Sequence, residues 1–439
     1  MRQLPDRAQG AARKAPRAPG AIFVAVAATL GTLPPLAAQD SIPACDPDDG
    51  GLTLPTGFCA LVVADDLGRI RHLAVHPDGD IYVAVRGRRD EAGGVIALRD
   101  TSGDGRADLV MRIVEDGGGT GIALDGEHLL YGRDDAVLRF RLSAEGLGVR
   151  GPAETLVSGL PATGGHAAKS LAIDGRGGLF VNVGSASNAC QVQDRARGSP
   201  GIDPCPELVS QAGIWRFPIE ATGLAQQDGE HWASGLRNTV ALAIRRLDGG
   251  LYGVVHGRDQ LHQNWPELYS EGSSAETPSE EFVRIERGKR YSWPECFHDP
   301  GLDALVLAPE YGGDGETVGR CASRTGPIAT YPAHWAPNAL AFYEARMFPD
   351  RYRGGAFIAF HGSWNRAPLP QGGYNVVFQP FGAKGPEGPW ERFAEGFAGP
   401  DRSPRGARHR PTGLAVGPDG SLYVSDDSGG RIWRILYAR

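Results

Sequence analysis

The chain has 439 residues, of which 41% are hydrophobic and 22% are charged, and its formal net charge is −7 at pH 7. Without the five basic residues and the one acidic residue of residues 1–38, the net charge becomes −11. An acidic chain that has no basic run after this segment is a poor match for nucleic acid or for an anionic membrane surface. We therefore expect a small molecule as the partner.

The N-terminus has the features of an export signal. Basic residues precede an apolar run at 21–33, and the small residues Ala37 and Ala38 follow it. The run is short for a membrane span and is followed by two prolines, which is typical of a signal peptide. The sequence predicts a signal peptide over residues 1–38 and a periplasmic or secreted mature chain without a membrane span. An uncleaved anchor is the alternative, and it would leave the domain in the same compartment.

One pattern recurs six times in the remaining chain: a short apolar strand, a turn rich in Pro, Asp and Gly, and a second strand rich in Tyr, Phe, Val and Ile. The copies begin near Leu73, Ile122, Leu171, Leu242, Leu340 and Leu414. Such a hairpin cannot bury both of its faces alone, so each copy must pack on its neighbours in a radial array. The sequence predicts an all-β fold, a six-bladed β-propeller over residues 39–439.

Residues 57–64 precede the first copy and are expected to form a strand that has no hairpin partner nearby. A propeller can close its ring by adding such a strand to its last blade, whose final strand is expected at 431–435. Closure leaves only short and protected sheet edges. We therefore expect the N-terminal strand to close the last blade.

All six cysteines follow residue 38 and occur as couples that are close in the sequence. An even number of cysteines in an exported protein indicates disulfides, although spacing alone permits fifteen connectivities. We favour the local pairs, which are Cys45–Cys59, Cys190–Cys205 and Cys296–Cys321. No couple has the spacing of a zinc site.

Three long polar segments, at residues 190–205, 260–279 and 298–325, are expected to be loops on one face of the disc. Binding and chemistry on a repeated scaffold usually lie on such loops. Surface insertion without function is the simpler interpretation of any single loop. We expect the substrate contacts in the first two segments.

Three short segments beside the repeated strands carry polar side chains. His166 could act as a general base at neutral pH. Arg237 and Asn238 offer donors and an acceptor to carboxylate or quinone oxygens, and residues 361–366 place polar groups around Trp364. The simpler interpretations are a hydrogen-bonded loop histidine, an arginine paired with a neighbouring blade, and a loop that packs its indole against the disc.

Four segments together resemble the pyrroloquinoline-quinone-dependent glucose/sorbosone dehydrogenase family. They are ASGLRN at 233–238, YSWPEC at 291–296, HGSWNR at 361–366 and RPTGLAVGPDG at 410–420. Their order and spacing match from about residue 57 to the C-terminus. The sorbosone-type branch, with its HGSWNR segment, is the closer match.

The resemblance implies an exported dehydrogenase that holds pyrroloquinoline quinone and Ca²⁺ over the central channel and oxidises a sugar or a sugar-derived aldehyde or alcohol. In that family, the histidine that matches His166 removes the hydroxyl proton, and the arginine that matches Arg237 polarises the quinone oxygen. The resemblance assigns cofactor contacts to Asn238, Asn365, Arg366 and Arg410, and calcium to the backbone carbonyls of Gly257 and Arg258. No CxxCH haem site occurs in the sequence, so electrons would leave to a separate acceptor such as a quinone or a cytochrome.

The sequence also departs from the glucose enzymes. Val240 stands where they carry a glutamine, Thr412 where they carry a second arginine, and Gly165 where an aspartate precedes their histidine. These changes favour a second function class, a non-catalytic propeller that binds a ligand or glycan without the cofactor. A third class, a calcium-dependent lactonase-type hydrolase, would need several carboxylates at the strand starts, where this chain has His166, Arg237 and His361.

Overall fold

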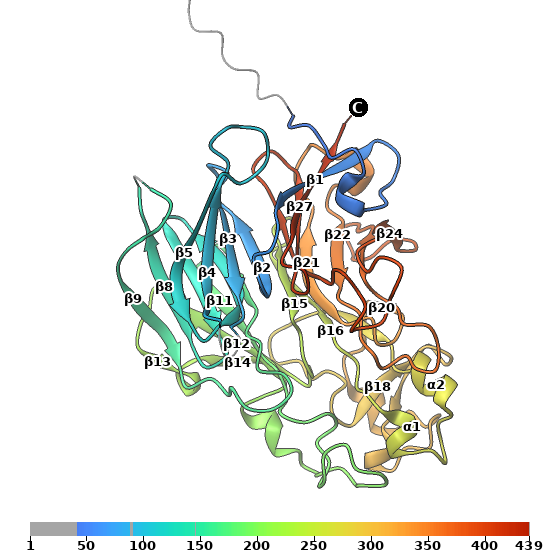
Figure 1. The fold of residues 1–439 in the computed structure, drawn as a ribbon. Coiled ribbons are helices and arrows are strands. Elements are labelled where there is room, and N and C mark those ends of the chain that lie inside the picture. The colour runs from blue at the N-terminus through green and yellow to red at the C-terminus, as the bar shows by residue number, and fades with distance from the viewer. Residues whose placement is uncertain (1–41, 88–90, 145, 439) are drawn as a thin grey trace, which may run out of the picture. The chain divides into compact units, whose positions relative to one another are not determined.

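A computed structural model of the chain describes residues 42–87, 91–144 and 146–438. The signal peptide expected over residues 1–38 lies outside the described residues. Pro43–Arg439 forms one compact unit, in which β-sheets stand side by side (Figure 1). Contacts between their first strands close these sheets into a ring. Among the described residues, no helix is both long enough and apolar enough to cross a membrane.

Six sheets, each built on four antiparallel strands, form the blades of the ring. Blade 1 contains β2 (Ile70–Val75), β3 (Ile81–Val85), β4 (Gly93–Arg99) and β5 (Leu109–Asp116). Blade 2 contains β6 (Gly119–Asp125), β7 (His128–Arg133), β8 (Val137–Leu142) and β9 (Val149–Ser158), and the edge strand β13 (Leu224–Ala225) pairs parallel with β9. Blade 3 contains β10 (Leu171–Ile173), β11 (Gly178–Val183), β12 (Gly213–Pro218) and β14 (Glu230–Ser234).

The second half of the ring repeats this order. Blade 4 contains β15 (Ala241–Arg245), β16 (Gly250–Val255), β17 (Glu280–Arg284) and β20 (Ala329–Tyr331). Blade 5 contains β21 (Pro337–Phe342), β22 (Ala356–Phe360), β23 (Asn375–Gln379) and β24 (Glu391–Ala394). Blade 6 contains β25 (Pro411–Val416), β26 (Leu422–Asp426), β27 (Ile432–Tyr437) and β1 (Phe58–Ala64).

The repeated hairpin supplies the first two strands of every blade. Leu73 is paired with Val83 in blade 1, and Leu414 is paired with Val424 in blade 6. The first strands β2, β6, β10, β15, β21 and β25 contact one another in this order, and β25 returns to β2. The six-bladed, all-β propeller predicted from the six repeats is therefore confirmed.

The hydrophobic core lies between the blades. Six buried clusters each join side chains of two neighbouring blades. The second strand of each blade contributes a fully buried aliphatic side chain, namely Val83, Leu130, Val181, Val254, Ile358 and Val424. Burial of apolar surface is the main favourable term in folding, so each blade depends on both neighbours for stability.

Strand β1 closes the ring, as the sequence predicted. It pairs antiparallel with β27, with Phe58 opposite Tyr437 (Figure 1). The Phe58 ring packs edge to face on four aromatic rings, those of Phe348, Tyr352, Phe393 and Tyr437. Edge-to-face aromatic pairs contribute energy beyond their buried area, so this junction joins the N-terminal strand firmly to blades 5 and 6.

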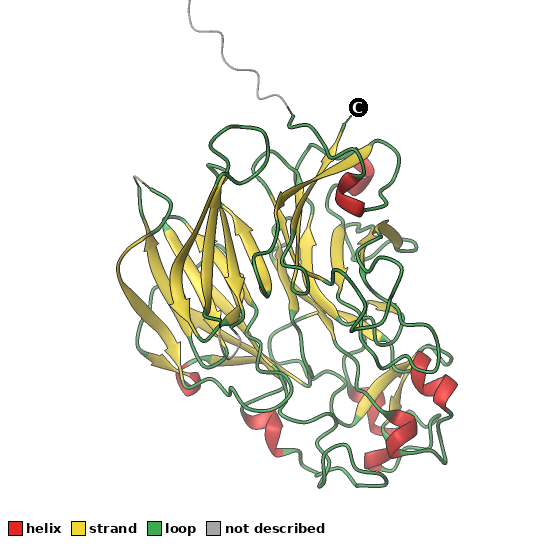
Figure 2. Cartoon of the chain, viewed as in Figure 1, coloured by secondary structure: helices red, strands yellow, loops and turns green. Residues whose placement is uncertain are grey.

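The long polar segments form a lobe that the sequence did not predict. Residues 260–279 were expected to be a loop, but they contain α1 (Leu261–Asn264) and α2 (Glu271–Glu276), which lie near β18 (Cys296–Asp299) in Figure 1. Strand β18 pairs with β19 (Ala304–Leu307). Figure 2 shows most helical turns at this end of the unit. The lobe has its own buried cluster of Leu261, Tyr269, Phe297, Val306 and Ala308.

Disulfides and 3-10 helices complete the unit. The disulfides are the local pairs favoured from the sequence, Cys45–Cys59, Cys190–Cys205 and Cys296–Cys321. The 3-10 helices are η1 (Asp49–Gly51), η2 (Pro206–Val209), η3 (Gln226–Asp228), η4 (Pro309–Tyr311), η5 (Gly319–Ser323) and η6 (Asp350–Tyr352).

Replacement of the closing aromatic side chain tests the ring closure. We expect Phe58→Ala to lower the free energy of unfolding by about 3–5 kcal/mol, because the change leaves a cavity among four aromatic rings. Leu109→Ala is the control, since Leu109 lies exposed in β5 and should change the stability by less than about 0.5 kcal/mol. Denaturant unfolding measures both values, and equal losses in the two variants would contradict the role given to β1.

Candidate active site

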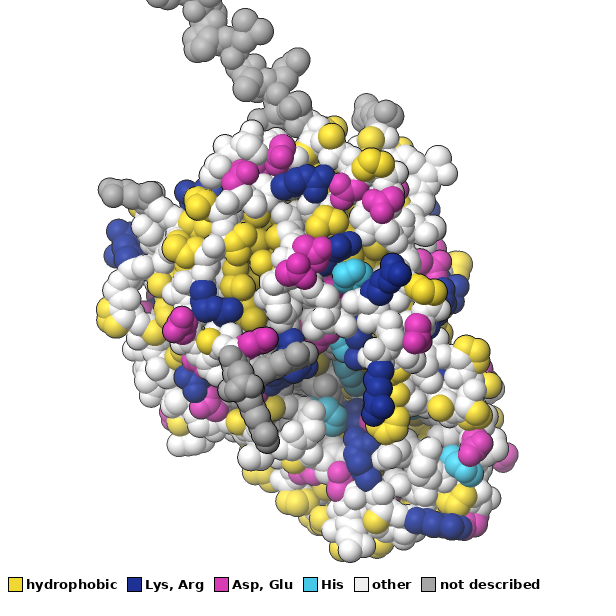
Figure 3. All heavy atoms as spheres, in the orientation of Figure 1, with side chains coloured by type: hydrophobic (Ala, Val, Ile, Leu, Met, Phe, Trp, Pro, Cys, Tyr) yellow, Lys and Arg dark blue, Asp and Glu magenta, His cyan; other side chains and the backbone are white. Residues whose placement is uncertain are grey.

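The residues singled out from the sequence lie at one mouth of the ring. His166, Arg237 and Arg410 precede the first strands β10, β15 and β25, whereas Gly257 and Asn365 follow the second strands β16 and β22. In an antiparallel hairpin, the start of the first strand lies beside the end of the second strand. These residues therefore share one end of the six inner hairpins. Figure 3 shows His, Lys and Arg side chains in a line down the middle of the face in view.

His166 is held by its Nδ1 atom, which lies 2.9 Å from the carbonyl oxygen and 3.0 Å from the hydroxyl oxygen of Ser185. That hydroxyl donates to Ser187 O at 2.7 Å, and a carbonyl oxygen can only accept. The hydrogen of the neutral ring therefore lies on Nδ1, and Nε2 carries a lone pair. Burial and the nearby Arg237 lower the pKa of His166 to about 3, which keeps the ring neutral at physiological pH.

The close approach behind His166 requires a glycine. A Cβ atom on Gly184 would lie 2.6 Å from the Cβ of His166 and 2.7 Å from its carbonyl oxygen. Real Cβ atoms do not approach other heavy atoms so closely, because such overlap is strongly repulsive. Gly184 therefore lets the end of β11 lie directly against the His166 loop.

Arg237 is buried and almost fully bonded within the protein. Its Nε donates to Asn188 O at 3.1 Å, and its Nη2 donates to Asn188 Oδ1 at 2.9 Å and to Asp259 Oδ2 at 3.0 Å. Its Nη1 donates to Gly257 O at 2.9 Å. A guanidinium carries five N–H groups, so one N–H on Nη1 remains for a ligand.

Asn238, the neighbour of Arg237, has a free donor. Its Oδ1 lies 3.4 Å from the Nδ2 of Asn182, and its backbone oxygen accepts from the N–H of His256 at 2.9 Å. Its own Nδ2 donates to no other residue in the described part of the chain. Asn238 is thus fixed by its backbone while its amide nitrogen stays free to bind a ligand.

The loop after β16 carries the two carbonyls that the resemblance assigned to calcium. The N–H of Gly257 donates to Glu280 Oε2 at 2.8 Å, and burial raises the pKa of Glu280 to about 7. The carbonyl oxygen of Gly257 accepts from Arg237, whereas the carbonyl oxygen of Arg258 accepts from no described residue. The Arg258 side chain is buried and forms an ion pair with Glu310. Every residue of this loop is therefore held in place.

Asp259 follows in the same loop and was missed by the sequence analysis. Its carboxylate bonds to Arg237, to Arg195 Nη2 at 3.2 Å and to Asn365 Nδ2 at 2.7 Å. Burial opposes its ionisation, but the charges of Arg237 and His334 lower the pKa of Asp259 to about 2. The carboxylate is therefore an anion at the centre of the charged network.

The loop after β22 carries Asn365 and Arg366. Asn365 donates its amide to Asp259, as described above. The guanidinium of Arg366 donates to the backbone carbonyls of Pro370 at 3.2 Å, Ala275 at 3.1 Å and Ala333 at 3.2 Å. The side chain of Arg366 therefore links this loop to α2 and to the segment before β21.

A second charged cluster joins blades 5, 6 and 1. Arg410 donates to the backbone carbonyls of His361 and Gly362. His361 Nε2 lies 2.7 Å from Asp427 Oδ1, and Arg71 Nη1 lies 2.5 Å from Asp427 Oδ2. Burial opposes its ionisation, but His361 and Arg71 hold the pKa of Asp427 well below its usual range. Arg71 and Asp427 were not predicted from the sequence.

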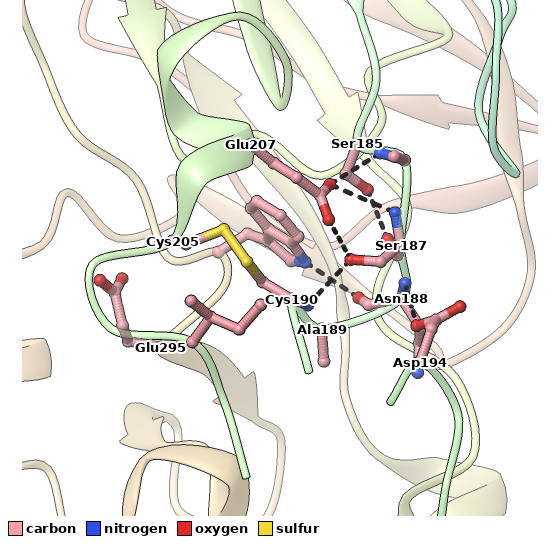
Figure 4. Close-up of a disulfide and its surroundings, with 12 residues drawn as sticks. Ser185, Ser187, Asn188, Ala189, Cys190, Asp194, Cys205, Glu207 and Glu295 are labelled. Atoms are coloured by element: carbon pink, nitrogen blue, oxygen red, sulfur yellow. Dashed lines mark hydrogen bonds between the residues drawn. A yellow bond between two sulfur atoms is a disulfide. The ribbon is translucent and has the colours of Figure 1, made fainter. Parts of the chain in front are cut away.

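The Cys190–Cys205 disulfide closes the loop that begins two residues after Asn188 (Figure 4). Glu207 accepts from the two backbone N–H groups that precede Asn188, at 2.7 and 3.2 Å. The indole of Trp293 donates to Asn188 O at 2.9 Å. These contacts fix the asparagine that receives two of the hydrogen bonds of Arg237.

Asp259, Asn188 and Arg71 escaped the sequence analysis because they act through partners in other blades. The position of Asp259 directly after the Gly257–Arg258 pair was the one usable signal. Within the described ranges, no group of three or more His, Cys, Asp and Glu side chains has the arrangement of a metal site.

A family model described as TrAA12-like matches residues 52–438. Among curated proteins, an uncharacterized protein of Borreliella burgdorferi is 27% identical over 266 residues. The match covers 60% of this chain, and the chain spans 61% of the length of that relative.

Several solved structures have the same fold. The holo form of the pyranose dehydrogenase PQQ domain from Coprinopsis cinerea has a TM-score of 0.71 at 20% identity, covering 88% of this chain and 97% of that chain. A calcium structure of Trichoderma reesei Carbohydrate-Active Enzymes family AA12 has a TM-score of 0.72 at 20% identity, with the same coverage. The PQQ-bound aldose sugar dehydrogenase from Streptomyces coelicolor has a TM-score of 0.53 at 17% identity, covering 88% and 99%.

These matches confirm the resemblance to quinone-dependent sugar dehydrogenases that was drawn from four sequence segments. The family model spans all six blades, from just before β1 to the end of β27. The chain therefore belongs to the TrAA12-like family.

Proposed function

We propose that this protein is a quinoprotein dehydrogenase that oxidises a sugar, or a sugar-derived aldehyde or alcohol, by hydride transfer to pyrroloquinoline quinone with Ca²⁺. The observation that carries the proposal is a neutral histidine with a free Nε2 lone pair, His166, close to the buried cation of Arg237. Membership of the TrAA12-like family and the fold shared with pyranose and aldose sugar dehydrogenases support it. The HGSWNR segment favours a sorbosone-type substrate.

The donors at the mouth fit a quinone that carries carboxylates. Asn238 has a free amide nitrogen, and the guanidinium of Arg410 hydrogen-bonds only to carbonyl oxygens among the described residues. The Nε of Arg71 is buried without a partner. Guanidinium and amide donors recognise carboxylate oxygens well. We propose Asn238 and Arg410 as cofactor contacts. Asn365 and Arg366 belong to the loop beside them, where Asn365 Nδ2 donates to Asp259 and Nε and Nη1 of Arg366 donate to backbone carbonyls.

The loop after β16 fits the proposed calcium ion. Calcium prefers oxygen ligands, including backbone carbonyls and carboxylates. The carbonyl oxygen of Arg258 accepts no hydrogen bond from the described residues, the carbonyl of Gly257 precedes it, and the anion of Asp259 follows it. We propose the carbonyls of Gly257 and Arg258 as the protein ligands.

The proposed chemistry divides between the cofactor and this chain. When bound, the quinone supplies the hydride acceptor and calcium strengthens it as a Lewis acid. The substrate hydroxyl loses its proton to Nε2 of His166 while its carbon loses a hydride, which leaves a carbonyl group. Ser185 fixes the tautomer of His166 through Nδ1, and the free Nη1–H of Arg237 supplies a preorganised donor for the negative charge that develops.

The proposed location is the periplasm or the exterior of the cell. Three disulfides support an oxidising compartment. In this setting, a separate quinone or cytochrome would receive the electrons.

One observation favours the alternative of a ligand-binding propeller without the cofactor. Val240 and Thr412, which replace longer polar residues of the glucose enzymes, are both buried. The hydroxyl of Thr412 accepts from Asn338 Nδ2 at 3.0 Å. These two side chains complete the protein interior and contribute no contact to a ligand.

Calorimetric titration of the purified mature protein with pyrroloquinoline quinone tests the proposal directly. We expect saturable binding in the presence of Ca²⁺ and much weaker binding when a chelator is present, because the proposed calcium ligands are carbonyls of the Gly257 loop. The absence of quinone binding under both conditions would favour the ligand-binding alternative.

The role of His166 is tested with the enzyme loaded with cofactor. We expect His166→Ala to lower kcat by about 10²- to 10⁴-fold, which is the usual contribution of a general base, while quinone affinity stays unchanged. His76→Ala is the matched control, since His76 lies beyond the opposite end of β2 and should leave kcat unchanged. Full activity of the His166→Ala protein would exclude His166 as the base.

The pH dependence follows from the pKa of His166, which is lowered from 6.5 to about 3. A base with a lowered pKa stays unprotonated as the pH falls through 6.5, and it takes up its proton only near the lower value. We therefore expect kcat/KM, measured at saturating cofactor, to show no loss due to His166 near pH 6.5. An acid limb centred near pH 6.5 would contradict this environment of the ring.

A further inference from the structure

Asp259 contacts both sides of the mouth through its two carboxylate oxygens. Oδ2 accepts from Arg237 Nη2 at 3.0 Å, and Oδ1 accepts from Asn365 Nδ2 at 2.7 Å. Arg237 precedes blade 4, whereas Asn365 lies in the loop of blade 5. One carboxylate therefore joins the two segments that the sequence analysis treated as separate.

The backbone of Asp259 is held as firmly as its side chain. Its N–H donates to Asn188 Oδ1 at 2.9 Å, and its carbonyl oxygen accepts from Asn188 Nδ2 at 2.9 Å. Asn188 Oδ1 also accepts from Arg237 Nη2 at 2.9 Å. Asp259, Asn188 and Arg237 thus form a closed network, in which the guanidinium cannot rotate without breaking several bonds.

The charge balance around the carboxylate supports the same role. Arg237 is buried, and Arg195 Nη2 lies 3.2 Å from the carboxylate. A buried arginine requires a well-oriented counter-ion, because removing one partner leaves an uncompensated charge.

We propose that Asp259 is a positioning residue that sets the orientation of Arg237 and couples it to the Asn365 loop. The proposal rests on the proposed function, in which Arg237 contacts the cofactor. It changes the role of Asn365 from a direct cofactor contact to a residue that acts through Asp259. The one side-chain hydrogen bond of Asn365 to a described residue goes to Asp259, so we expect its influence on the cofactor to pass through the Asp259–Arg237 pair.

A double-mutant cycle separates the indirect role from direct contact. Asp259→Ala, Asn365→Ala and the double variant are titrated with pyrroloquinoline quinone in the presence of Ca²⁺. We expect Asp259→Ala to weaken quinone binding about ten-fold or more, the equivalent of one charge-assisted hydrogen bond. Asn365→Ala should weaken binding in the parent protein but have no further effect in the Asp259→Ala background. Additive effects of the two changes would show that Asn365 acts independently and would overturn the proposal.

Two further variants guard against a general loss of structure. Asp80→Ala is the matched control, because Asp80 is also buried and forms an ion pair with Arg99. Asp80 lies in the turn between β2 and β3, at the end of blade 1 that is opposite the mouth. It should lower the melting temperature and leave quinone affinity unchanged. Asp259→Asn keeps an acceptor for Arg237 but turns an amide donor toward Asn365. If Asp259→Ala does not fold, the cycle is run with Asp259→Asn, and the same absence of additivity is expected.

A cofactor-free readout distinguishes failure of this inference from failure of the proposed function. The melting temperatures of the same four proteins are measured without quinone. If the parent protein binds no quinone, the proposed function fails, but non-additive melting temperatures still support the coupling between Asp259 and Asn365. Additive melting temperatures together with additive quinone affinities would overturn the coupling itself.

Discussion

The antiparallel pairing of β1 with β27 is the contact on which the rest of the molecule depends. Each blade buries its faces against two neighbours, so the core is complete only when the two ends of the chain meet. An open ring would expose the face of a blade and unpaired strand edges. Closure also brings Arg71 into contact with Asp427, which lies 356 residues away along the chain. The geometry of the mouth therefore follows from the completeness of the ring.

The closed ring permits charges that would be unfavourable elsewhere. Arg237 is buried, but four of its five N–H groups bind to Asn188, Gly257 and Asp259. Its desolvation is thus compensated before any ligand arrives, and its orientation is set in advance. The same cation helps to keep His166 neutral. Proton removal requires a neutral base, which is His166. The negative charge that develops requires a nearby cation in a fixed orientation, which is Arg237.

Local signals in the sequence were sufficient for the blades but insufficient for much of the site. An apolar strand or a Pro/Asp/Gly turn is recognised from residues that are adjacent in the sequence. The six blades and the closing strand could therefore be predicted. The helices at 260–279 could not, because Tyr269 packs on Phe297 and Val306 from a separate segment. His166 and Arg237 were found because they adjoin repeated strands. The orientation of Arg366 toward backbone carbonyls depends on packing that no single segment specifies.

The replacement of an arginine by Thr412 has a physical explanation in the neighbouring blade. A Cβ atom on Gly413 would lie 2.7 Å from the backbone oxygen of Arg71, so β25 and β2 approach each other closely at this point. Successive side chains of a strand point to opposite faces, so the side chain at position 412 lies on the other face of β25, toward blade 5. Thr412 is fully buried there, and an arginine at this position would need a buried counter-ion. Thr412 instead accepts a hydrogen bond from Asn338. The buried cation of blade 1 is Arg71, which comes from the far end of the sequence and is paired with Asp427, so this part of the ring carries a positive charge without an arginine at position 412.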